Sequence, residues 1–264
     1  MWILRIKMTD RTYRLEEVPA PYKNLGGRGM TSTIVHDEVP PLCHPLGPNN
    51  KLVFAPGIVT GTAAPTSARI SVGAKSPLTG GIKESNAGSA WPQHLAFMQI
   101  KALVVEGQPK EKGKYWMAYL TWDGKAGKPK VEFFGADQYK GGDLYEVFPK
   151  VFKRFGAAIG IAGFGVAGEY GYANSGIVFN DLVKRPSRYS GRGGLGAVMA
   201  SKGLKFIVTD GKGAPQVAIA DKALFEQGTK KMAEALRSHD ITKPKGALNT
   251  YGTAVLVNIM NEAG

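Results

Sequence analysis

The sequence predicts an α+β chain with a strand-rich domain over residues 1–210, followed by the first helices of a second domain over residues 211–264. Short apolar runs between turn residues recur up to about residue 210, as the buried strands of a sheet do. Longer stretches with helical spacing interrupt these runs. Beyond Gly211-Lys212-Gly213-Ala214-Pro215 the strand pattern stops, and only helical segments follow.

The strands are expected in chain order from these apolar runs. The chain opens with a hairpin of residues 2–7 and 12–18, joined by the turn Thr9-Asp10-Arg11. Further strands are predicted over residues 52–55, 70–74, 102–105, 115–122, 130–134, 157–162, 176–179 and 206–209. Residues 83–89 are polar and are predicted to form a loop. No internal repeat is evident in the sequence.

Helices are predicted where apolar residues recur at a spacing of three and four. Within the strand-rich domain they span residues 30–39, 91–98, 143–155 and 195–202. Pro40-Pro41 ends the first of them. Beyond residue 210, Asp221 is the expected N-cap of a helix that ends near Ser238, and residues 253–261 begin another.

The composition is that of an ordinary globular protein, with 43% hydrophobic and 21% charged residues in 264. The apolar runs are far shorter than a membrane span, so no membrane partner is expected. The single cysteine, Cys43, excludes an internal disulfide and fits a reducing compartment. The expected location is therefore the cytoplasm.

The chain is strongly basic. Its 34 Lys and Arg outnumber its 21 Asp and Glu, which gives a net charge of +13 at pH 7. Such a balance fits nucleic acid, an anionic cofactor or an acidic partner surface. The basic residues are spread along the chain, with neither an RNA-recognition signature nor zinc-finger spacing. A nucleic-acid partner is therefore not favoured.

One stretch carries the strongest functional signal: residues 188–199, with the sequence Arg-Tyr-Ser-Gly-Arg-Gly-Gly-Leu-Gly-Ala-Val-Met. Glycine lets the backbone approach a ligand, and arginine presents a planar fork of donors to phosphate or carboxylate. If a helix starts at Leu195, its free amide groups would face the same anion. The stretch is interpreted as a loop that holds an anionic cofactor. A glycine-rich surface turn with solvated arginines is the alternative.

Other motifs do not define a site. Residues 163–168 and 191–196 match G-x-G-x-x-G, but neither has the strand, helix and acidic residue that a dinucleotide site needs. Cys43-His44 has no further cysteine with which to form a structural metal site. Glu84 and Glu169 lie near glycine-rich loops, where lone carboxylates more often hydrogen-bond within the loop. No catalytic constellation is visible.

Arginine or asparagine recurs on the predicted loops between strands, at Arg28, Arg69, Asn86, Arg188 and Arg192. Several such loops that converge would form a polar cradle for a large anionic ligand. Ordinary loop chemistry in a β-rich domain is the alternative on these grounds alone.

Several collinear motifs resemble the amino-terminal domain of the tungsten-containing aldehyde ferredoxin oxidoreductases. They are residues 50–57 (NKLVFAPG), 60–66 (TGTAAPT), 75–80 (KSPLTG), 165–169 (GVAGE), 191–199 (GRGGLGAVM) and 201–205 (SKGLK). The likeness runs in order from residue 2 to about residue 210, and residues 253–264 continue it into the family's second domain. The resemblance implies a two-sheet base domain that carries a bis-pterin cofactor of tungsten or molybdenum.

The resemblance also implies a set of site residues. By motif, the pterins and their phosphates would contact Arg69, Asn86, Gly88, Arg188, Tyr189, Gly191 and Arg192. Backbone carbonyls of Asn86 and Tyr189 would hold a magnesium ion between the two phosphates, in keeping with the preference of a hard cation for oxygen ligands. The implied reaction converts a small aldehyde to a carboxylic acid, or the reverse. Its electrons would pass through a 4Fe–4S cluster to ferredoxin or to an iron–sulfur partner subunit.

The chain departs from the family pattern in three ways. Tyr189 stands where the family usually has a small residue, and Asn86-Ala87-Gly88-Ser89 differs from the usual Asn-Ser-Gly-Gly. A cluster needs several cysteine thiolates, and Cys43 is the only cysteine. The family's cluster ligands and acid–base residues would lie beyond residue 264, so no catalytic residue is assigned and the chain alone is not expected to catalyse. The expected partner is the remainder of the catalytic polypeptide or a complementary chain. A non-catalytic module that binds a pterin or another phosphate ligand is the alternative.

Overall fold

The structure is a computed structural model that describes residues 1–264. It divides the chain into two compact units, Met1–Thr62 with Ser67–Val217 and Ala63–Thr66 with Ala218–Gly264. Both sheets lie in the first unit, and the second unit contains helices and no strand. The assignment of residues 211–264 to a second, helical domain stays a prediction.

The first sheet has six strands. They are β1 (Trp2–Lys7), β2 (Thr12–Glu17), β3 (Leu52–Pro56), β4 (Arg69–Lys75), β5 (Ile82–Gly88) and β6 (Ile100–Glu106). Their order across the sheet is β2-β1-β6-β3-β4-β5, and only β1 and β6 run parallel. β5 is therefore an edge strand, paired with β4 alone.

The second sheet also has six strands. They are β7 (Trp116–Asp123), β8 (Lys128–Gly135), β9 (Gly160–Gly163), β10 (Ile177–Phe179), β11 (Arg188–Ser190) and β12 (Leu204–Thr209). Their order is β8-β7-β12-β9-β10-β11, and only β7 and β12 run parallel. Here β11 is an edge strand, paired with β10 alone.

The two sheets repeat one topology, because adding six to each strand number of the first sheet gives the order of the second. The parallel pair is irregular at the same place in both: the register skips Lys101 in β6 and Lys205 in β12. The amides of Trp2 and Trp116, which open the partner strands, each donate at 2.8 Å to a carbonyl that lies just before β6 or β12. The first unit is thus a structural repeat of two halves that the sequence does not reveal.

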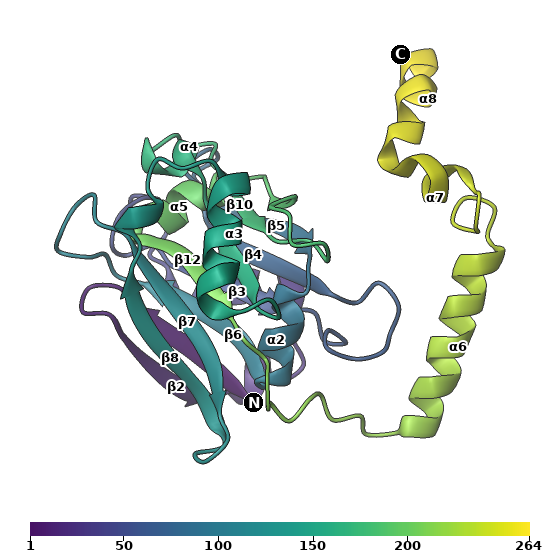
Figure 1. Cartoon of the computed structure of the whole chain (residues 1–264), viewed down its shortest axis with the longest axis horizontal. Coiled ribbons are helices and arrows are strands. Elements are labelled where there is room, and N and C mark those ends of the chain that lie inside the picture. The colour runs from purple at the N-terminus through teal and green to yellow at the C-terminus, as the bar shows by residue number, and fades with distance from the viewer. The chain divides into compact units, whose positions relative to one another are not determined.

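Helices take equivalent places in the two halves. Buried apolar residues of α1 (Gly27–Glu38) pack on one face of the first sheet. In the second half, α3 (Leu144–Phe155) lies over the second sheet (Figure 1), and its Phe148 ring is 6.1 Å from that of Phe206. Both α2 (Trp91–Phe97) and α5 (Leu195–Ser201) contact strands of both sheets. The two sheets and the two helices that contact both of them therefore share one large core.

Both faces of the first sheet are buried, since successive residues of a strand point to opposite faces. In β6, Ala102 packs with α1, and the next residue, Leu103, joins the core shared with the second sheet. Trp91 of α2 lies within this core, with its ring 5.4 Å from that of Phe54 and 5.5 Å from that of Phe179. Its indole N–H donates to a carbonyl of β12, so α2 is bonded to the second sheet as well as packed on it.

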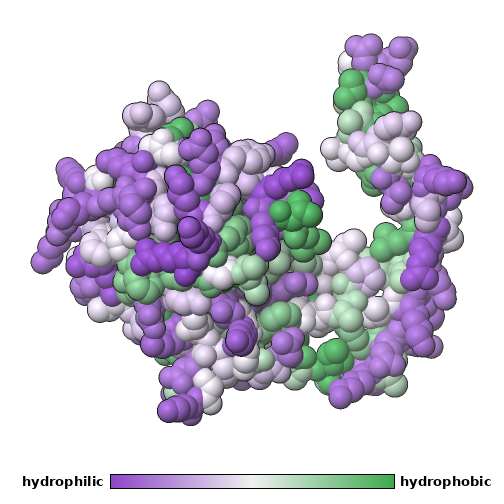
Figure 2. Space-filling model, in the orientation of Figure 1, coloured by the Kyte–Doolittle hydropathy of each residue, from purple (hydrophilic) through white to green (hydrophobic).

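Short helices complete the first unit, and further helices form the second. They are η1 (Ala20–Tyr22), η2 (Asp137–Tyr139), α4 (Val166–Glu169), α6 (Lys222–Ser238), α7 (Ala247–Tyr251), η3 (Gly252–Val255) and α8 (Leu256–Ala263). Asp221 Oδ1 accepts from the amide of Leu224 at 2.9 Å, which confirms the predicted N-cap. The helices of the second unit bury none of their residues, and apolar side chains of α8 are exposed (Figure 2). No helix in the chain is both long enough and apolar enough to cross a bilayer.

The structure confirms the α+β class with two sheets, corrects two of the predicted elements and adds a strand that was not predicted. Residues 83–89 were predicted as a loop, but most of them belong to β5. The strand predicted over residues 157–162 begins only at Gly160, and β11 is a strand that the sequence did not indicate. Both β5 and β11 are edge strands with one free side, so polar side chains remain solvated there and no apolar run marks them.

Candidate cofactor site where the two sheets meet

The edge strands β5 and β11 lie next to each other. Ser190 Oγ donates to the carbonyl of Ser85 at 3.4 Å, and the amide of Arg192 donates to Ser85 Oγ at 3.3 Å. Ser76, which follows β4, donates from Oγ to the carbonyl of Gly193 at 2.8 Å. The end of β11 and the loop after it are therefore held in place by three side-chain hydrogen bonds to the first half.

All seven residues predicted to contact a cofactor lie on β4, β5 and β11 or directly after β11. Arg69 opens β4 opposite Gly88, Asn86 and Gly88 lie in β5, Arg188 and Tyr189 lie in β11, and Gly191 and Arg192 follow it. Six of them are exposed and Gly88 is half-buried. The sequence placed these groups on loops. Most of them lie within strands instead, at free edges where an exposed polar side chain has room.

Asn86 and Tyr189 occupy the same register position in the two halves. Asn86 pairs with Ser71 of β4, and Tyr189 pairs with Val178 of β10. Ser71 and Val178 in turn face corresponding positions of β3 and β9. A glycine, Gly88 or Gly191, follows two residues later in each half. The adjoining edges of the two sheets, at β5 and β11, thus present two equivalent backbone segments; together they are called the edge below.

Gly88 gives Arg69 room to cross the end of β5. A Cβ on Gly88 would lie 3.0 Å from Nη1 of Arg69 and 3.5 Å from its Cδ. Any larger side chain at position 88 would therefore displace the guanidinium. Arg69 is exposed, so its donors remain available to a ligand.

The arginines at this edge differ in their partners. Arg28, at the start of α1, pairs with Glu84 of β5 at an Nε–Oε2 distance of 3.2 Å. Arg69, Arg188 and Arg192 form no ion pair within the chain. Guanidinium groups bind phosphate or carboxylate through paired donors, so three unpaired arginines at one edge fit an anionic ligand.

The start of α5 is not the free anion site that the sequence suggested. The helix has seven residues, and the amide of Gly196 in its first turn already donates to the carbonyl of Ser175 at 2.8 Å. A Cβ on Gly196 would lie 2.2 Å from the carbonyl oxygen of Gly176, so this turn is packed against backbone. An anion at the edge would depend on the arginine side chains instead.

Tyr189 brings a large side chain to a position where related sequences were expected to have a small one. Its side chain is 52% exposed. Burial raises the pKa of the phenol, and the nearby phenol of Tyr145 and carboxylate of Asp143 raise it further. Tyr189 therefore keeps its proton at neutral pH and can donate a hydrogen bond.

Glu169 holds the second half together. It forms an ion pair with Lys205, the fully buried lysine skipped by the register of β12, and its Oε2 accepts from the amide of Gly141 at 2.7 Å. Lys205 also donates to the carbonyl of Phe164 at 2.8 Å. Glu169 was predicted to be a hydrogen-bonding loop residue; it does form such bonds, but it ends helix α4 and does not lie in a loop. Its partners connect α4, β12 and the segment before α3.

Metal ligands of the usual side-chain kind are not grouped in this chain. Nowhere do three or more His, Cys, Asp or Glu side chains gather so that they could hold an ion. Cys43 is a free, half-buried cysteine. A cation at the edge would need backbone or ligand oxygens, which hard cations such as magnesium accept.

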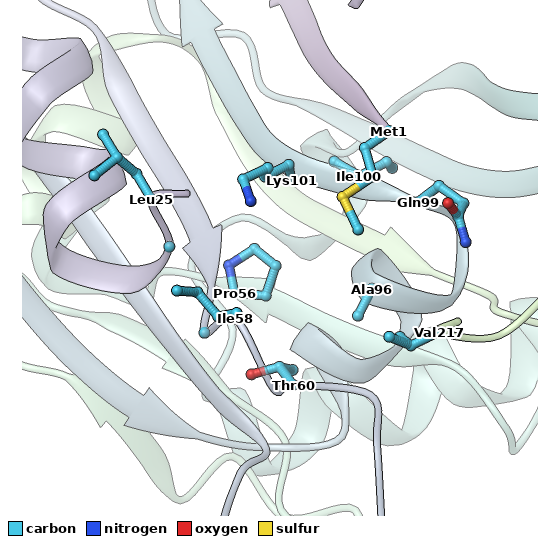
Figure 3. Close-up of a pocket in the computed structure, with 12 residues that line it drawn as sticks. Met1, Leu25, Pro56, Ile58, Thr60, Ala96, Gln99, Ile100, Lys101 and Val217 are labelled. Carbon is cyan, nitrogen blue, oxygen red and sulfur yellow. The ribbon is translucent and has the colours of Figure 1, made fainter. Parts of the chain in front are cut away.

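A small, partly open pocket lies elsewhere in the first unit. It is lined by Met1, Leu25, Gly26, Pro56, Gly57, Ile58, Thr60, Ala96, Gln99, Ile100, Lys101 and Val217 (Figure 3). Its volume is about 40 Å³, room for roughly one water molecule. None of the seven predicted residues lines it. The candidate site is therefore the open edge and not this pocket.

Comparisons with known proteins agree with this fold. Residues 3–211 match the family profile described as aldehyde ferredoxin oxidoreductase, N-terminal domain. The chain is 38% identical to a tungsten-containing aldehyde ferredoxin oxidoreductase of Thermococcus kodakarensis and 36% identical to one of Pyrococcus furiosus. Each alignment covers 99% of this chain and 41% of the relative.

A solved structure is similar as well: the active site complex BamBC of benzoyl coenzyme A reductase in complex with 1,5-dienoyl-CoA. The TM-score is 0.78 at 26% identity, and the match covers 89% of this chain and 34% of that chain.

Fold and site together define an α+β domain with an edge that fits an anionic ligand. The chain belongs to the aldehyde ferredoxin oxidoreductase family and matches its amino-terminal domain. The chain spans 41% of the length of these two relatives.

Proposed function

We propose that this chain is the cofactor-binding part of a tungsten- or molybdenum-pterin oxidoreductase that interconverts aldehydes and carboxylic acids. One observation supports it beyond family membership: two equivalent edge segments lie beside three unpaired arginines. A bis-pterin cofactor has two similar halves, each with a phosphate. A domain that repeats one backbone arrangement offers each half an equivalent place.

The residues at the edge fit such a group. Arg69, Arg188 and Arg192 would bind phosphate oxygens through charge-assisted hydrogen bonds. Gly88 and Gly191 would let the ligand approach the backbone. Carbonyl oxygens of Asn86 and Tyr189 would hold a magnesium ion between the phosphates. When bound, the cofactor supplies the two-electron chemistry, and the protein supplies binding and orientation.

Electron transfer would need further polypeptide. A 4Fe–4S cluster is held by cysteine thiolates, and Cys43 is the only cysteine in the chain. We therefore propose that the remainder of the catalytic polypeptide, or a complementary chain, supplies the cluster ligands and the acid–base residues. Ferredoxin or an iron–sulfur subunit would accept the electrons, and this chain alone would not turn over aldehyde.

The test is elemental analysis for tungsten, molybdenum, magnesium and iron on natively purified protein, with pterin fluorescence and the intact mass of each co-purifying chain. Tungsten or molybdenum with pterin, together with iron in a cysteine-bearing companion, is the expected result. The absence of both metals and of pterin from such a preparation would overturn the proposal.

A non-catalytic binding module is the second candidate. The observation that favours it is that none of the seven edge residues is a histidine, aspartate or glutamate able to move a proton in catalysis. Such a module would carry a pterin or another phosphate ligand without iron and without a cysteine-bearing companion. The same measurement therefore separates the two functions.

A further inference from the structure

Lys101 and Lys205 occupy the same position in the two halves, at the residue that the register of β6 or β12 skips. In the second half, the fully buried Lys205 forms an ion pair with Glu169. In the first half, the half-buried Lys101 donates to the carbonyl of Lys23 at 2.6 Å and forms no ion pair. Both halves thus keep a lysine at this position, but only the second half supplies its counterion.

The strand registers identify the residue that corresponds to Glu169. Two residues after the skipped lysine, β6 pairs with Phe54 of β3 and β12 pairs with Ala162 of β9. Gly61 and Glu169 each lie seven residues further along the chain than these two partners. The first half therefore has a glycine where the second half has the carboxylate.

The turn that precedes each of these two positions supports the correspondence. In the first half, the amide of Thr60 donates to the carbonyl of Gly57 at 3.0 Å. In the second half, the amide of Gly168 donates to the carbonyl of Gly165, also at 3.0 Å. The backbone therefore turns in the same way in both halves, and the difference lies in the side chain that follows.

A pocket lies beside Lys101 in the first half. It is the pocket drawn in Figure 3, where the amine of Lys101 is directed toward Pro56. Pro56, Ile58 and Thr60, which line it, belong to the segment directly before Gly61, and no Asp or Glu is among the lining residues. Its volume of about 40 Å³ suits the head of a carboxylate and excludes a large ligand. Because the pocket is partly open, the rest of such a molecule can stay outside.

Gly61 cannot supply the missing carboxylate itself. A Cβ at this position would lie 2.8 Å from Cβ of Ala96 and 2.8 Å from Cγ2 of Val217, and both residues line the pocket. Gly61 also has a φ of +85°, which favours glycine. A carboxylate in this pocket must therefore come from outside the chain.

Lys101 retains donors for such a group. A lysine ammonium has three N–H donors, and the bond to the carbonyl of Lys23 uses one of them. Burial lowers the pKa of Lys101, because no opposite charge compensates for the loss of water around the ammonium. A carboxylate within hydrogen-bonding distance would favour the charged form and raise this pKa again.

We propose that this pocket is a carboxylate-binding site, and that a bound carboxylate pairs there with Lys101 as Glu169 pairs with Lys205. The carboxylate belongs either to a small free anion such as formate or to an Asp or Glu side chain of polypeptide that accompanies this chain. The site is separate from the proposed cofactor site, since none of the seven edge residues lines the pocket.

Competitive acetylation of the full chain with N-acetoxysuccinimide, read residue by residue by mass spectrometry, tests this site. The reagent attacks neutral amines, so a carboxylate that keeps Lys101 protonated slows its acetylation. At constant pH and equal ionic strength, sodium formate should slow the labelling of Lys101 by about 3-fold or more relative to sodium chloride. Lys125, an exposed lysine between β7 and β8, is the internal control and should react equally in both salts.

Thermal unfolding gives a second measurement. Formate should raise the melting temperature of the wild type above its value in chloride, and Lys101→Met should lose this difference. Near-ultraviolet circular dichroism checks that the variant is folded. Equal labelling of Lys101 in the two salts would overturn the proposal. A formate effect of the same size at Lys125 would mean that formate acts on lysines in general, and it would also reject the site.

Labelling of the complex with an accompanying polypeptide separates the two sources of the carboxylate. If a side chain of that polypeptide fills the pocket, Lys101 in the complex should react slowly without formate, and formate should change nothing further. If the ligand is a free anion, Lys101 in the complex should respond to formate as it does in the chain alone.

Discussion

Asn86 and Tyr189 stand at the same register position on the free edges of two sheets that share one topology. Their side chains have nothing in common: the Asn86 amide donates to Ser71 Oγ at 3.2 Å, whereas the Tyr189 phenol is half exposed beside α3. What the two residues share is the placement of their backbone. A ligand that makes the same contacts with both halves would therefore bind the main chain at these two positions.

Replacing the side chain of Tyr189 should leave cation binding intact. We expect Tyr189→Ala to retain the magnesium and pterin content of the wild type after native purification, because the proposed ligand is the backbone carbonyl. Asn86→Ala is the matched variant in the other half and should behave in the same way. Loss of magnesium from Tyr189→Ala but not from Tyr189→Phe would show that the aromatic ring is required, and the backbone assignment would be wrong.

Removing the guanidinium of Arg188 should lower cofactor content. One charge-assisted hydrogen bond to phosphate contributes about 1.5–3 kcal/mol, so Arg188→Ala should lose about 10-fold or more in affinity. Pterin fluorescence and metal content of the purified variant measure this loss. Arg237→Ala, which removes an exposed arginine of α6 far along the chain, is the control. Wild-type pterin content in Arg188→Ala would contradict the assignment.

Much of this fold follows from local sequence, and the exceptions share a cause. Buried strands such as β3 and β6 are continuous apolar runs, and the pattern of apolar and polar residues marks them clearly. β5 reads Ile-Lys-Glu-Ser-Asn-Ala-Gly, which is typical of a loop, and it becomes a strand because β4 supplies its partner. Pairing with a distant strand is a tertiary effect that no short window contains.

The residues of the candidate site also fall into two groups: those that the sequence marks and those that only the fold reveals. Arg188, Gly191 and Arg192 lie in one conspicuous stretch. The recurrence of arginine and asparagine between predicted strands adds Arg69 and Asn86, and the family resemblance adds Gly88. Ser85 and Ser76 carry no signal of their own, because a buried serine that bonds another segment looks like any loop serine. Their role depends on the meeting of two sheets. The repeat that makes Asn86 equivalent to Tyr189 is visible only in strand order and register.

Lys202 should make stability depend on pH in alkaline solution. Its side chain is fully buried, and its Nζ donates to carbonyl oxygens of Gly47 at 3.0 Å and of Asn50 at 2.5 Å. Burial lowers the pKa of Lys202 from 10.5 to about 8. The unfolded chain then binds more protons than the folded protein between pH of about 8 and 10.5, so the free energy of unfolding should rise with pH across this window.

The variant Lys202→Met isolates this contribution. Methionine stands at the equivalent place of the first half, as Met98, where it is also fully buried. Urea unfolding of both proteins at several pH values from about 7.5 to 10.5 should show the wild type gaining stability relative to the variant. Because the other titratable groups are the same in both proteins, the difference between their free energies of unfolding reports the contribution of Lys202. A difference that stays constant over this window would mean that folding does not lower the pKa of Lys202.

Replacement of two helical glycines, Gly228 and Gly196, by alanine should change stability in opposite directions. In an exposed helix, Gly→Ala stabilises by about 0.5–1 kcal/mol, because alanine loses less backbone freedom. Gly228 of α6 meets this condition, since a Cβ there would contact nothing within 4 Å. Gly228→Ala should therefore raise the helical signal of α6 and its melting temperature in far-ultraviolet circular dichroism.

Gly196→Ala should instead destabilise the first unit by roughly 1–3 kcal/mol, the usual cost of an overpacked interior. A Cβ at this position would lie 2.2 Å from the carbonyl oxygen of Gly176 and 2.7 Å from Ser175 Oγ, and backbone cannot move aside as a flexible side chain can. Urea unfolding monitored by near-ultraviolet circular dichroism measures this loss. Because α5 directly follows the Arg192 loop, the same variant should also bind pyrophosphate more weakly. A Gly196→Ala protein as stable as wild type would show that α5 does not pack against Gly176 in solution, and that the loop before it is not fixed in this way.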